Sequence, residues 1–407
     1  MATFWPTRDR SDRGATIRAM ANPSIRSPIG ASLTLAELEA EPYAAFARLR
    51  AHEPVSWVPV LGGWIVTRRD LCVAVMRDAT RFTVDDPHFS TARVVGPSML
   101  SLDGDEHRRH RDPFARAFLG PDAQDRFAGE IAAEARRLVE RLAPAGAAEI
   151  RRELAGPLAV NVVVRALQLI DALADTVRGW YDEIVAAVDR VSVGGEIGPA
   201  ARDAVDDLGR SVTRTIDRGA GVLAAAADAL AVREVASNAA VMMFGGIETA
   251  EGMTTSAFWH VLSAPGAVDA LRADRSLAAN AVEESLRLEP AASRVDRYAT
   301  TEVELAGARI ARGDLVIVSL TAANRDPAFF PDPDAFDVER VNARSHLTFA
   351  VGPHACVGIH LARLEALTAL EMGLEHWPDL HLGAGAGPPS GLIFRKPRSL
   401  PVRWTSA

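Results

Sequence analysis

The chain has 407 residues, of which 48% are hydrophobic and 24% charged, and its formal net charge is −8. These are the proportions of a globular protein with a substantial core, and the negative balance gives no global reason to expect a nucleic-acid partner. No run approaches the roughly 20 apolar residues that a membrane span needs. We therefore predict a protein that binds neither nucleic acid nor membrane.

The first 30 residues are polar and rich in arginine, without the apolar segment of a secretory signal. We predict a loose N-terminal arm over residues 1–30. Because no linker rich in Pro, Gly or Ser interrupts the remainder, we predict a single domain over residues 31–407. The chain has two cysteines, Cys72 and Cys356, which excludes a disulfide framework and indicates a reducing cytoplasm. Cys72 lies in an apolar helical stretch and is expected to be inert core.

Alanine and leucine dominate with a period of 3.6, which predicts a mainly α-helical fold with small β-sheets. In chain order we expect a helix over Glu39–His52, a hairpin over Val55–Thr67 that turns at residues 61–63, a helix over Arg69–Arg77, an irregular segment over Phe82–Leu102, alanine-rich helices over 122–228, a long helix over Ala231–Leu262, a helix over Asn280–Arg287, a hairpin over Val303–Ile310 and a helix that begins at Ile359.

A basic segment opens the helix that follows Asp103. His107 and Arg111 are one helical turn apart and therefore share a face. Arg108 and Arg109 lie between them. A solvated basic patch is the simplest interpretation of such a segment, and for Arg108 we prefer it.

The long helix contains the sequence Phe244-Gly245-Gly246-Ile247-Glu248-Thr249. Each glycine inside a helix costs roughly 1 kcal/mol relative to alanine, so the pair needs a reason such as the close approach of a ligand. The adjacent acid and alcohol, Glu248 and Thr249, could deliver protons. The alternatives are a packing contact for the glycines, a surface position for Glu248, and a Thr249 hydroxyl bonded back to a carbonyl.

A second helical pair, Glu284 and Arg287, is spaced at i and i+3. Such pairs are common on solvated helix surfaces and usually contribute only a few tenths of a kcal/mol. By itself the pair carries little information.

The most informative stretch runs from Phe349 to Gly358, with glycines on both sides of Cys356 and a helix directly after it. A cysteine just before a helix N-terminus is favoured as thiolate. One thiolate is too little for structural zinc, which needs four ligands, but it suffices for haem iron, to which the porphyrin gives four nitrogens. The alternative is a buried cysteine acting as a small apolar residue.

Together, the four motifs resemble those of the cytochrome P450 family and follow its order between Asp103 and Arg363. The resemblance implies the P450 fold, with a long central helix over haem b as cofactor. By that resemblance Cys356 is the iron ligand, and Glu248 and Thr249 relay protons during oxygen activation. The further residues it implies are Phe349, Gly352 and Gly358 in the haem-binding loop, His107, Arg111, Arg297 and His354 at the haem propionates, Gly245 beside the bound oxygen, and Glu284 with Arg287 as a buried structural brace.

The chain departs from the family pattern at one position of the brace. The family usually supplies a third basic residue where this chain has Ala335. A buried and unpaired Glu284 would be costly, so some cation should reach it. Arg340 is the candidate.

The resemblance implies a soluble monooxygenase that inserts one oxygen atom of O2 into a C–H or similar bond of a mostly apolar small molecule, in natural-product tailoring. It implies a cytoplasmic monomer that receives electrons from a separate ferredoxin or flavodoxin with its NAD(P)H reductase, docking near Arg108 and Arg109. By family position the substrate pocket is formed by Met99, Leu100, Phe244, Val295 and Ile393.

Two alternatives stay open. The same haem scaffold could run oxidative coupling, nitration or peroxygenation, although a peroxygenase would not need Glu248 and Thr249. The chain could also be a non-catalytic haem sensor, which would need neither these two residues nor a substrate pocket.

Overall fold

The computed structural model describes residues 27–120, 123–169, 171–192, 194–219 and 221–406. Helices dominate them and the strands form small sheets, so the predicted mainly α-helical class is confirmed. Most of the predicted N-terminal arm, residues 1–26, lies outside the described residues. Of its last part, Ser27 is buried and Pro28 begins the first helix. The division into an arm and one domain stays a prediction.

The helices are α1 (Pro28–Ser32), α2 (Leu35–Ala40), α3 (Tyr43–His52), α4 (Arg69–Arg77), α5 (Ser90–Val95), α6 (Gly104–Leu119), α7 (Ala123–Leu142), α8 (Gly156–Leu167), α9 (Ala174–Ser192), α10 (Pro199–Asp217), α11 (Gly221–Ala227), α12 (Val232–Ser263), α13 (Ala267–Ala273), α14 (Leu277–Leu288), α15 (Leu320–Ala323) and α16 (Ile359–His376). Shorter helical turns are η2 (Pro59–Leu61), η3 (Ala143–Ala145), η4 (Ile150–Ala155) and η5 (Ala343–Ser345).

The strands are β1 (Val55–Val58), β2 (Gly63–Val66), β3 (Phe82–Thr83), β4 (Ala147–Glu149), β5 (Arg294–Ala299), β6 (Val303–Leu305), β7 (Ala308–Ile310), β8 (Leu315–Ser319), β9 (His381–Leu382), β10 (Pro389–Ser390), β11 (Lys396–Pro397) and β12 (Pro401–Arg403). The largest sheet has the order β1-β2-β8-β5-β3, in which only β2 and β8 pair in parallel. Strands β4, β12 and β9 form a second sheet, and β6–β7 and β10–β11 are two-stranded.

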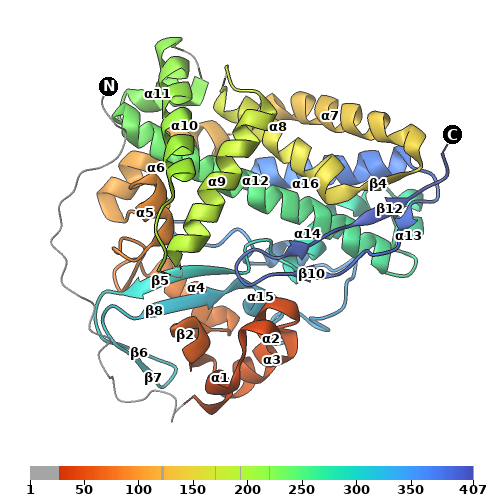
Figure 1. The fold of residues 1–407 in the computed structure, drawn as a ribbon. Coiled ribbons are helices and arrows are strands. Elements are labelled where there is room, and N and C mark those ends of the chain that lie inside the picture. The colour runs from red at the N-terminus through yellow and green to blue at the C-terminus, as the bar shows by residue number, and fades with distance from the viewer. Residues whose placement is uncertain (1–26, 121–122, 170, 193, 220, 407) are drawn as a thin grey trace.

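Helix α12 is the central element of the fold. It crosses the middle of the molecule, with α7, α8, α9, α10 and α16 on one side and the large sheet with α1 to α4 toward the other (Figure 1). Buried residues occur on every face of α12, as expected for a helix enclosed by protein on all sides. The prediction of a long helix over Ala231–Leu262 is confirmed to within one residue at each end.

Two predicted segments were wrong in detail. The helix predicted over Glu39–His52 is divided into α2 and α3, because Pro42 has no N–H to continue the helical ladder and Glu41 before it leaves the helical conformation. The segment Phe82–Leu102, predicted to be irregular, contains the short strand β3 and the helix α5. The predicted hairpins and the helix Arg69–Arg77 are present.

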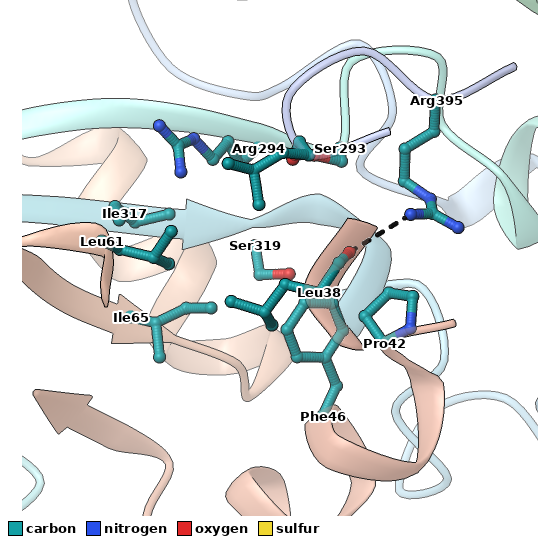
Figure 2. A pocket seen from close by; sticks show the side chains of 11 residues that line it. Leu38, Pro42, Phe46, Leu61, Ile65, Ser293, Arg294, Ile317, Ser319 and Arg395 are labelled. Carbon is teal, nitrogen blue, oxygen red and sulfur yellow. Dashed lines mark hydrogen bonds between the residues drawn. The ribbon is translucent and has the colours of Figure 1, made fainter. Parts of the chain in front are cut away.

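A small apolar cavity separates the N-terminal helices from the large sheet (Figure 2). Leu38, Phe46 and Ile65 are among the side chains that line it, and Arg395 closes one end by donating to the Leu38 carbonyl at 3.4 Å. The cavity is not lined by the residues predicted to form the substrate pocket.

Candidate active site

The cysteine loop is a tight turn before α16. The amide of Cys356 donates to the carbonyl of Phe349 at 2.9 Å, and that of Ala355 donates to Gly352 at 3.1 Å. Gly352 has φ of +82°, and a Cβ there would lie 2.6 Å from the Met76 carbonyl oxygen. Only glycine fits this position, and the reason is the end of α4 rather than a ligand.

The Cys356 thiol lies among groups that stabilise a negative charge. Burial raises the pKa of the thiol, while the N–H of Gly358 and the nearby guanidinium groups of Arg111 and Arg363 lower it. Arg111 also donates to the carbonyl of Ala355 at 2.5 Å, which ties α6 to the loop. A ligated thiolate would therefore be held by a hydrogen bond and two cations.

Beside the loop, α6 and β5 present buried polar atoms that have no hydrogen-bond partner among the described residues. Two of them are Nε2 of His107 and one terminal nitrogen of Arg297. Burial, with smaller contributions from His354 and Arg111, lowers the pKa of His107 to about 4. Buried donors without partners are rare in folded proteins and require an explanation.

The carboxylate of Asp103 interacts electrostatically with His107 and Arg297. It also lies 2.8 Å from Nε2 of His354. The rings of His107 and His354 are 4.3 Å apart. Hydrogen bonds, including those from His354 and Thr83, hold the pKa of Asp103 well below its usual range although burial acts in the opposite direction.

Apolar surface near these groups is incompletely covered. Residues 354–364 are only partly buried, including the apolar Val357 and Leu361. Gly245 is exposed in the middle of α12, although Met243 and Ile247 on either side are buried, and a Cβ at Gly245 would meet nothing within 4 Å. A flat group with two carboxylates, ligated by one thiolate, fits this combination of open apolar surface and unpartnered donors.

Comparison with known proteins agrees with this geometry. A family model described as Cytochrome P450 matches residues 222–378. The chain is 33% identical over 402 residues to the cytochrome P450 monooxygenase PikC of Streptomyces venezuelae, covering 90% of this chain and 92% of that protein. It is 30% identical to 6-deoxyerythronolide B hydroxylase of Saccharopolyspora erythraea, covering 89% and 95%.

The chain belongs to the cytochrome P450 family. Its fold is the P450 fold: it superposes on the crystal structure of CalO2 with a TM-score of 0.83 at 30% identity, over 90% of this chain and 96% of that one. Like its relatives it is a monooxygenase, an oxidoreductase whose cofactor is haem b. No helix in the described part of the chain is long and apolar enough to cross a membrane.

The predicted acid and alcohol of this P450, Glu248 and Thr249, lie on α12. Glu248 is buried, and its carboxylate accepts a hydrogen bond from the Tyr181 hydroxyl. The carboxylate also forms an ion pair with Lys396, whose Nζ lies 2.7 Å away. The surface position considered for Glu248 is thus wrong. The Thr249 hydroxyl donates to the carbonyl of Gly245, which is the local bond considered as an alternative to a relay.

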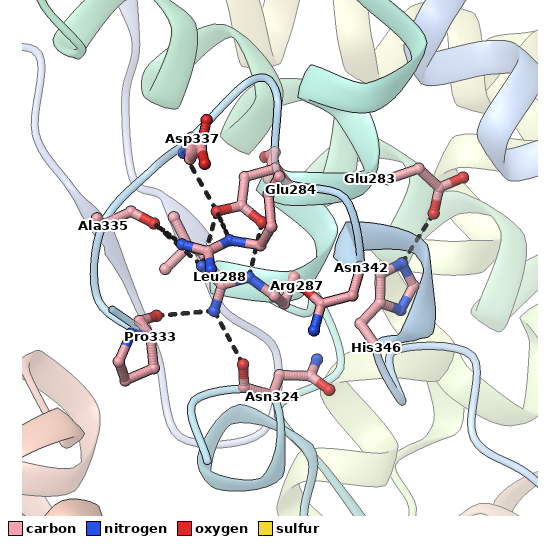
Figure 3. Close-up of polar contacts among 12 residues, drawn as sticks. Glu283, Glu284, Arg287, Leu288, Asn324, Pro333, Ala335, Asp337, Asn342 and His346 are labelled. Carbon is pink, nitrogen blue, oxygen red and sulfur yellow. Dashed lines mark hydrogen bonds and ion pairs between the residues drawn. The ribbon is translucent and has the colours of Figure 1, made fainter. Parts of the chain in front are cut away.

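The structural brace is buried, and Arg340 completes it. Arg287 donates twice to Glu284, at 2.7 Å each, and both side chains are fully buried (Figure 3). Arg340 donates from Nε to Glu284 at 2.8 Å, so it supplies the cation that is missing at Ala335. The Ala335 carbonyl accepts from both arginines.

The predicted pocket residues are only partly brought together. Phe244 packs edge to face on Phe394, with ring centroids 5.4 Å apart, and Phe394 follows Ile393. The Ile393 carbonyl accepts from Ser293 at 2.8 Å, which places the C-terminal segment beside the start of β5 and so near Val295. In a separate contact, the amide of Met99 donates to the Asn238 side chain of α12 at 2.8 Å.

Leu100 is half-buried and packs against the main core. It lies in the turn at residues 99–101 that precedes α6. Its place in a substrate pocket stays a prediction, as do the roles of the other predicted site residues.

Sequence reasoning missed three residues of the site. Asp103 and Tyr181 had no sequence signal, because their importance depends on contacts between distant elements. Lys396 did have one: it is the only lysine in the chain, all other basic side chains except histidine being arginine.

Proposed function

We propose that this P450 inserts one oxygen atom of O2 into a C–H or similar bond of a mostly apolar small molecule in natural-product tailoring. The proposal is supported chiefly by full-length similarity to relatives named as a 23-monooxygenase and a hydroxylase of particular small molecules. The apolar side chains of Met99, Phe244 and Phe394 near α12 favour an apolar substrate.

We assign Cys356 as the thiolate ligand, supported by the N–H of Gly358 and the charges of Arg111 and Arg363. When bound, the haem supplies the iron at which O2 is activated and transferred to substrate. Phe349 would help to fix the loop, because its ring lies under the Arg363 guanidinium at 4.8 Å from the centroid.

The propionates would bind Nε2 of His107 and the terminal nitrogen of Arg297 that has no partner among the described residues, with Arg111 near His107. His354 is a weaker candidate for this role, because its Nε2 is already bonded to Asp103. It could still orient His107 through the ring contact.

Glu248 and Thr249 would hold and move protons on the open side of α12. The half-buried Thr249 hydroxyl lies one turn from the exposed Gly245, and Glu248 is the adjacent buried acid. A positioned acid of this kind contributes typically 10²–10⁴-fold to proton transfer.

Electrons would come from a separate ferredoxin or flavodoxin and its reductase, to a monomeric P450. Arg108 is a suitable docking residue because its side chain is 66% exposed and, among the described residues, pairs with the exposed Asp105 alone. Arg109 is less suitable than predicted, since Glu106 and Glu234 both pair with it. The cytoplasmic location, inferred from two free cysteines, stays a prediction.

Turnover under ¹⁸O₂ tests the function. The holoenzyme with a surrogate ferredoxin, its reductase and NADPH would be incubated with a panel of apolar natural products. We expect a product that carries one ¹⁸O atom and is absent without reductase. A product formed only with added hydrogen peroxide would indicate peroxygenation, and a coupled product without ¹⁸O would indicate oxidative coupling.

The variant Thr249→Ala separates an enzyme from a sensor. In a monooxygenase it should increase the peroxide released per NADPH oxidised. An unchanged ratio, together with no product from any compound, would contradict the proposal and favour a haem sensor.

A further inference from the structure

Two carboxylates on α12 share one ammonium group. Glu248 and Glu251 are three residues apart and lie on one face of the helix. Nζ of Lys396 is 2.7 Å from Glu248 and 2.9 Å from Glu251. The lysine comes from β11, far along the chain, and all three side chains are largely buried. The segment that carries Lys396 packs directly on α12 at Gly252, where a Cβ would lie in ordinary contact with the Lys396 Cβ, at 3.5 Å.

The two carboxylates differ in their other partners. Glu251 also pairs with Arg151 from η4 at 2.6 Å and Arg178 from α9 at 3.1 Å. Burial raises the pKa of Glu251, but the charge of Lys396 and its other cationic partners outweigh burial and lower it. Glu251 therefore stays balanced by two guanidinium groups even when Lys396 is neutral.

Glu248 is held differently. Its partners among the described residues are the Tyr181 hydroxyl from α9 and the ammonium group of Lys396. Lys396 is thus the one cation that contacts this carboxylate in the described part of the chain. The Lys396 side chain is 12% exposed and that of Glu248 is 11% exposed, against 3% for Glu251, so the pair retains some access to water.

The choice of lysine at this point is informative. The chain uses arginine for every other one of its 45 Lys and Arg residues. A guanidinium could bridge two carboxylates at least as well, because it offers five donors, but it does not release a proton in proteins. An ammonium group can release one. The single lysine therefore occupies the position where a removable proton lies against the acid of α12.

We propose that Lys396 is the positioning residue of the Glu248 relay and that the two residues move a proton as a unit. Nζ gives one proton to the Glu248 carboxylate, which leaves a neutral amine and a neutral acid. The acid passes its proton to the Thr249 oxygen as that hydroxyl releases its own proton toward the side of α12 at Gly245, and the amine regains a proton from bulk solvent, which restores the ion pair. Arg151 and Arg178 keep Glu251 balanced during this exchange. The inference rests on the proposed role of Glu248.

Substitution of Lys396 by arginine or methionine tests the proposal in the holoenzyme. Arginine retains the bridge and its charge, whereas methionine retains only the chain length. We expect both variants to slow oxygen-dependent NADPH oxidation at least tenfold with a surrogate ferredoxin and reductase, and to change its solvent deuterium isotope effect. Arg165→Lys is the control, because it makes an arginine-to-lysine change in a half-exposed ion pair with Glu130, outside the cluster, and it should stay within twofold of the wild type.

The outcomes separate the two proposals. If Lys396→Arg restores the wild-type rate and isotope effect, the lysine only anchors the C-terminal segment and this inference is wrong. If Glu248→Gln itself has the wild-type rate, the relay assigned to Glu248 fails as well. Reduced carbon monoxide spectra and unfolding curves of all variants verify that each one folds and binds haem.

A second readout does not depend on turnover. Because the chain has one lysine, holoenzyme labelled with ¹⁵N-ε-lysine gives a single side-chain ammonium signal, best observed in the diamagnetic ferrous carbon monoxide form. We expect Glu248→Gln to shift this signal and to speed the exchange of its protons with water. Glu183→Gln, an exposed change on α9, should leave it unchanged. A signal that does not respond to Glu248→Gln would overturn the proposal.

Discussion

Nε of Arg340 lies 2.8 Å from the carboxylate of Glu284, and both side chains are buried. This contact replaces the basic residue that the family usually supplies at the position of Ala335. Arg340 also donates to the carbonyls of Pro331, Asp332 and Ala335. The brace is therefore built from Glu284, Arg287 and Arg340, with the third member displaced by five residues along the chain.

Arg340→Ala should destabilise the protein by about 3 kcal/mol, because it removes one of two cations from a buried carboxylate and leaves buried carbonyls without donors. Urea unfolding of the holoenzyme measures this change. Arg344→Ala, at a side chain that is 72% exposed and 3.9 Å from Glu283, should change the free energy of unfolding by less than about 0.5 kcal/mol. Equal effects of the two substitutions would show that Arg340 is not part of the brace.

The parts of the site that are defined by residue spacing within one segment could be predicted from the sequence. The cysteine loop, the glycine pair on α12 and the Glu284–Arg287 pair each lie within one element, so their motifs could be recognised without the fold. Arg340 was only a candidate, because its reach to Glu284 depends on how the loop after α15 folds over α14. Lys396 meets Glu248 across 148 positions of the chain, and no local pattern predicts such a contact.

Contacts between distant elements also explain two features of Gly352 and Arg109 that the sequence does not show. The sequence places Gly352 in the cysteine loop but does not show that a Cβ there would meet the backbone at the end of α4. From the sequence, Arg109 is expected to be available for docking, because one of its two carboxylate partners, Glu234, is distant along the chain and the pairing cannot be seen without the fold. Both findings depend on contacts between elements, and docking at Arg109 stays a prediction.

Cys356→Ser should abolish the thiolate signature. The dithionite-reduced variant under carbon monoxide should lose the strongly red-shifted Soret band that a thiolate ligand produces. Cys72→Ala is the control: its thiol is fully buried, donates to the Val66 carbonyl at 3.3 Å and has a pKa raised by burial. It should cost stability without moving the band. A red-shifted band that survives Cys356→Ser would exclude Cys356 as the ligand.

Arg297→Met should weaken haem binding at least tenfold without destabilising the haem-free protein. The buried guanidinium has one nitrogen without a partner among the described residues, and removing a buried polar group that lacks a hydrogen bond relieves a desolvation cost. The rate of haem transfer to excess apomyoglobin and urea unfolding of the haem-free protein measure the two effects.

Arg294→Met is the matched control for Arg297. Arg294 lies on the same strand with its side chain on the opposite face, paired with Asp296 at 3.2 Å. It should leave the rate of haem loss near that of the wild type. If both substitutions release haem equally fast, the effect comes from β5 as a whole and not from a propionate contact at Arg297.

Glu365 on α16 should make stability depend on pH. Its side chain is buried, one carboxyl oxygen has no partner among the described residues, and burial raises its pKa from 4.5 to about 8. Between these values the folded protein keeps a proton that the unfolded chain has lost. The contribution of Glu365 is therefore fully present below about pH 4.5 and is lost as pH rises through about 8.

Glu365→Gln removes this dependence, because glutamine is neutral at every pH. Compared with the wild type, the variant should gain stability as pH rises, reaching a difference on the order of 3 kcal/mol near pH 8 relative to pH 5. Urea unfolding at a series of pH values measures the difference, in which the titration of all other groups cancels. Glu183→Gln, at an exposed position of α9, should give a difference that does not vary with pH. A flat difference for Glu365→Gln as well would show that its carboxyl group is ionised in the folded protein, which requires a cation or water at the oxygen that now has no partner.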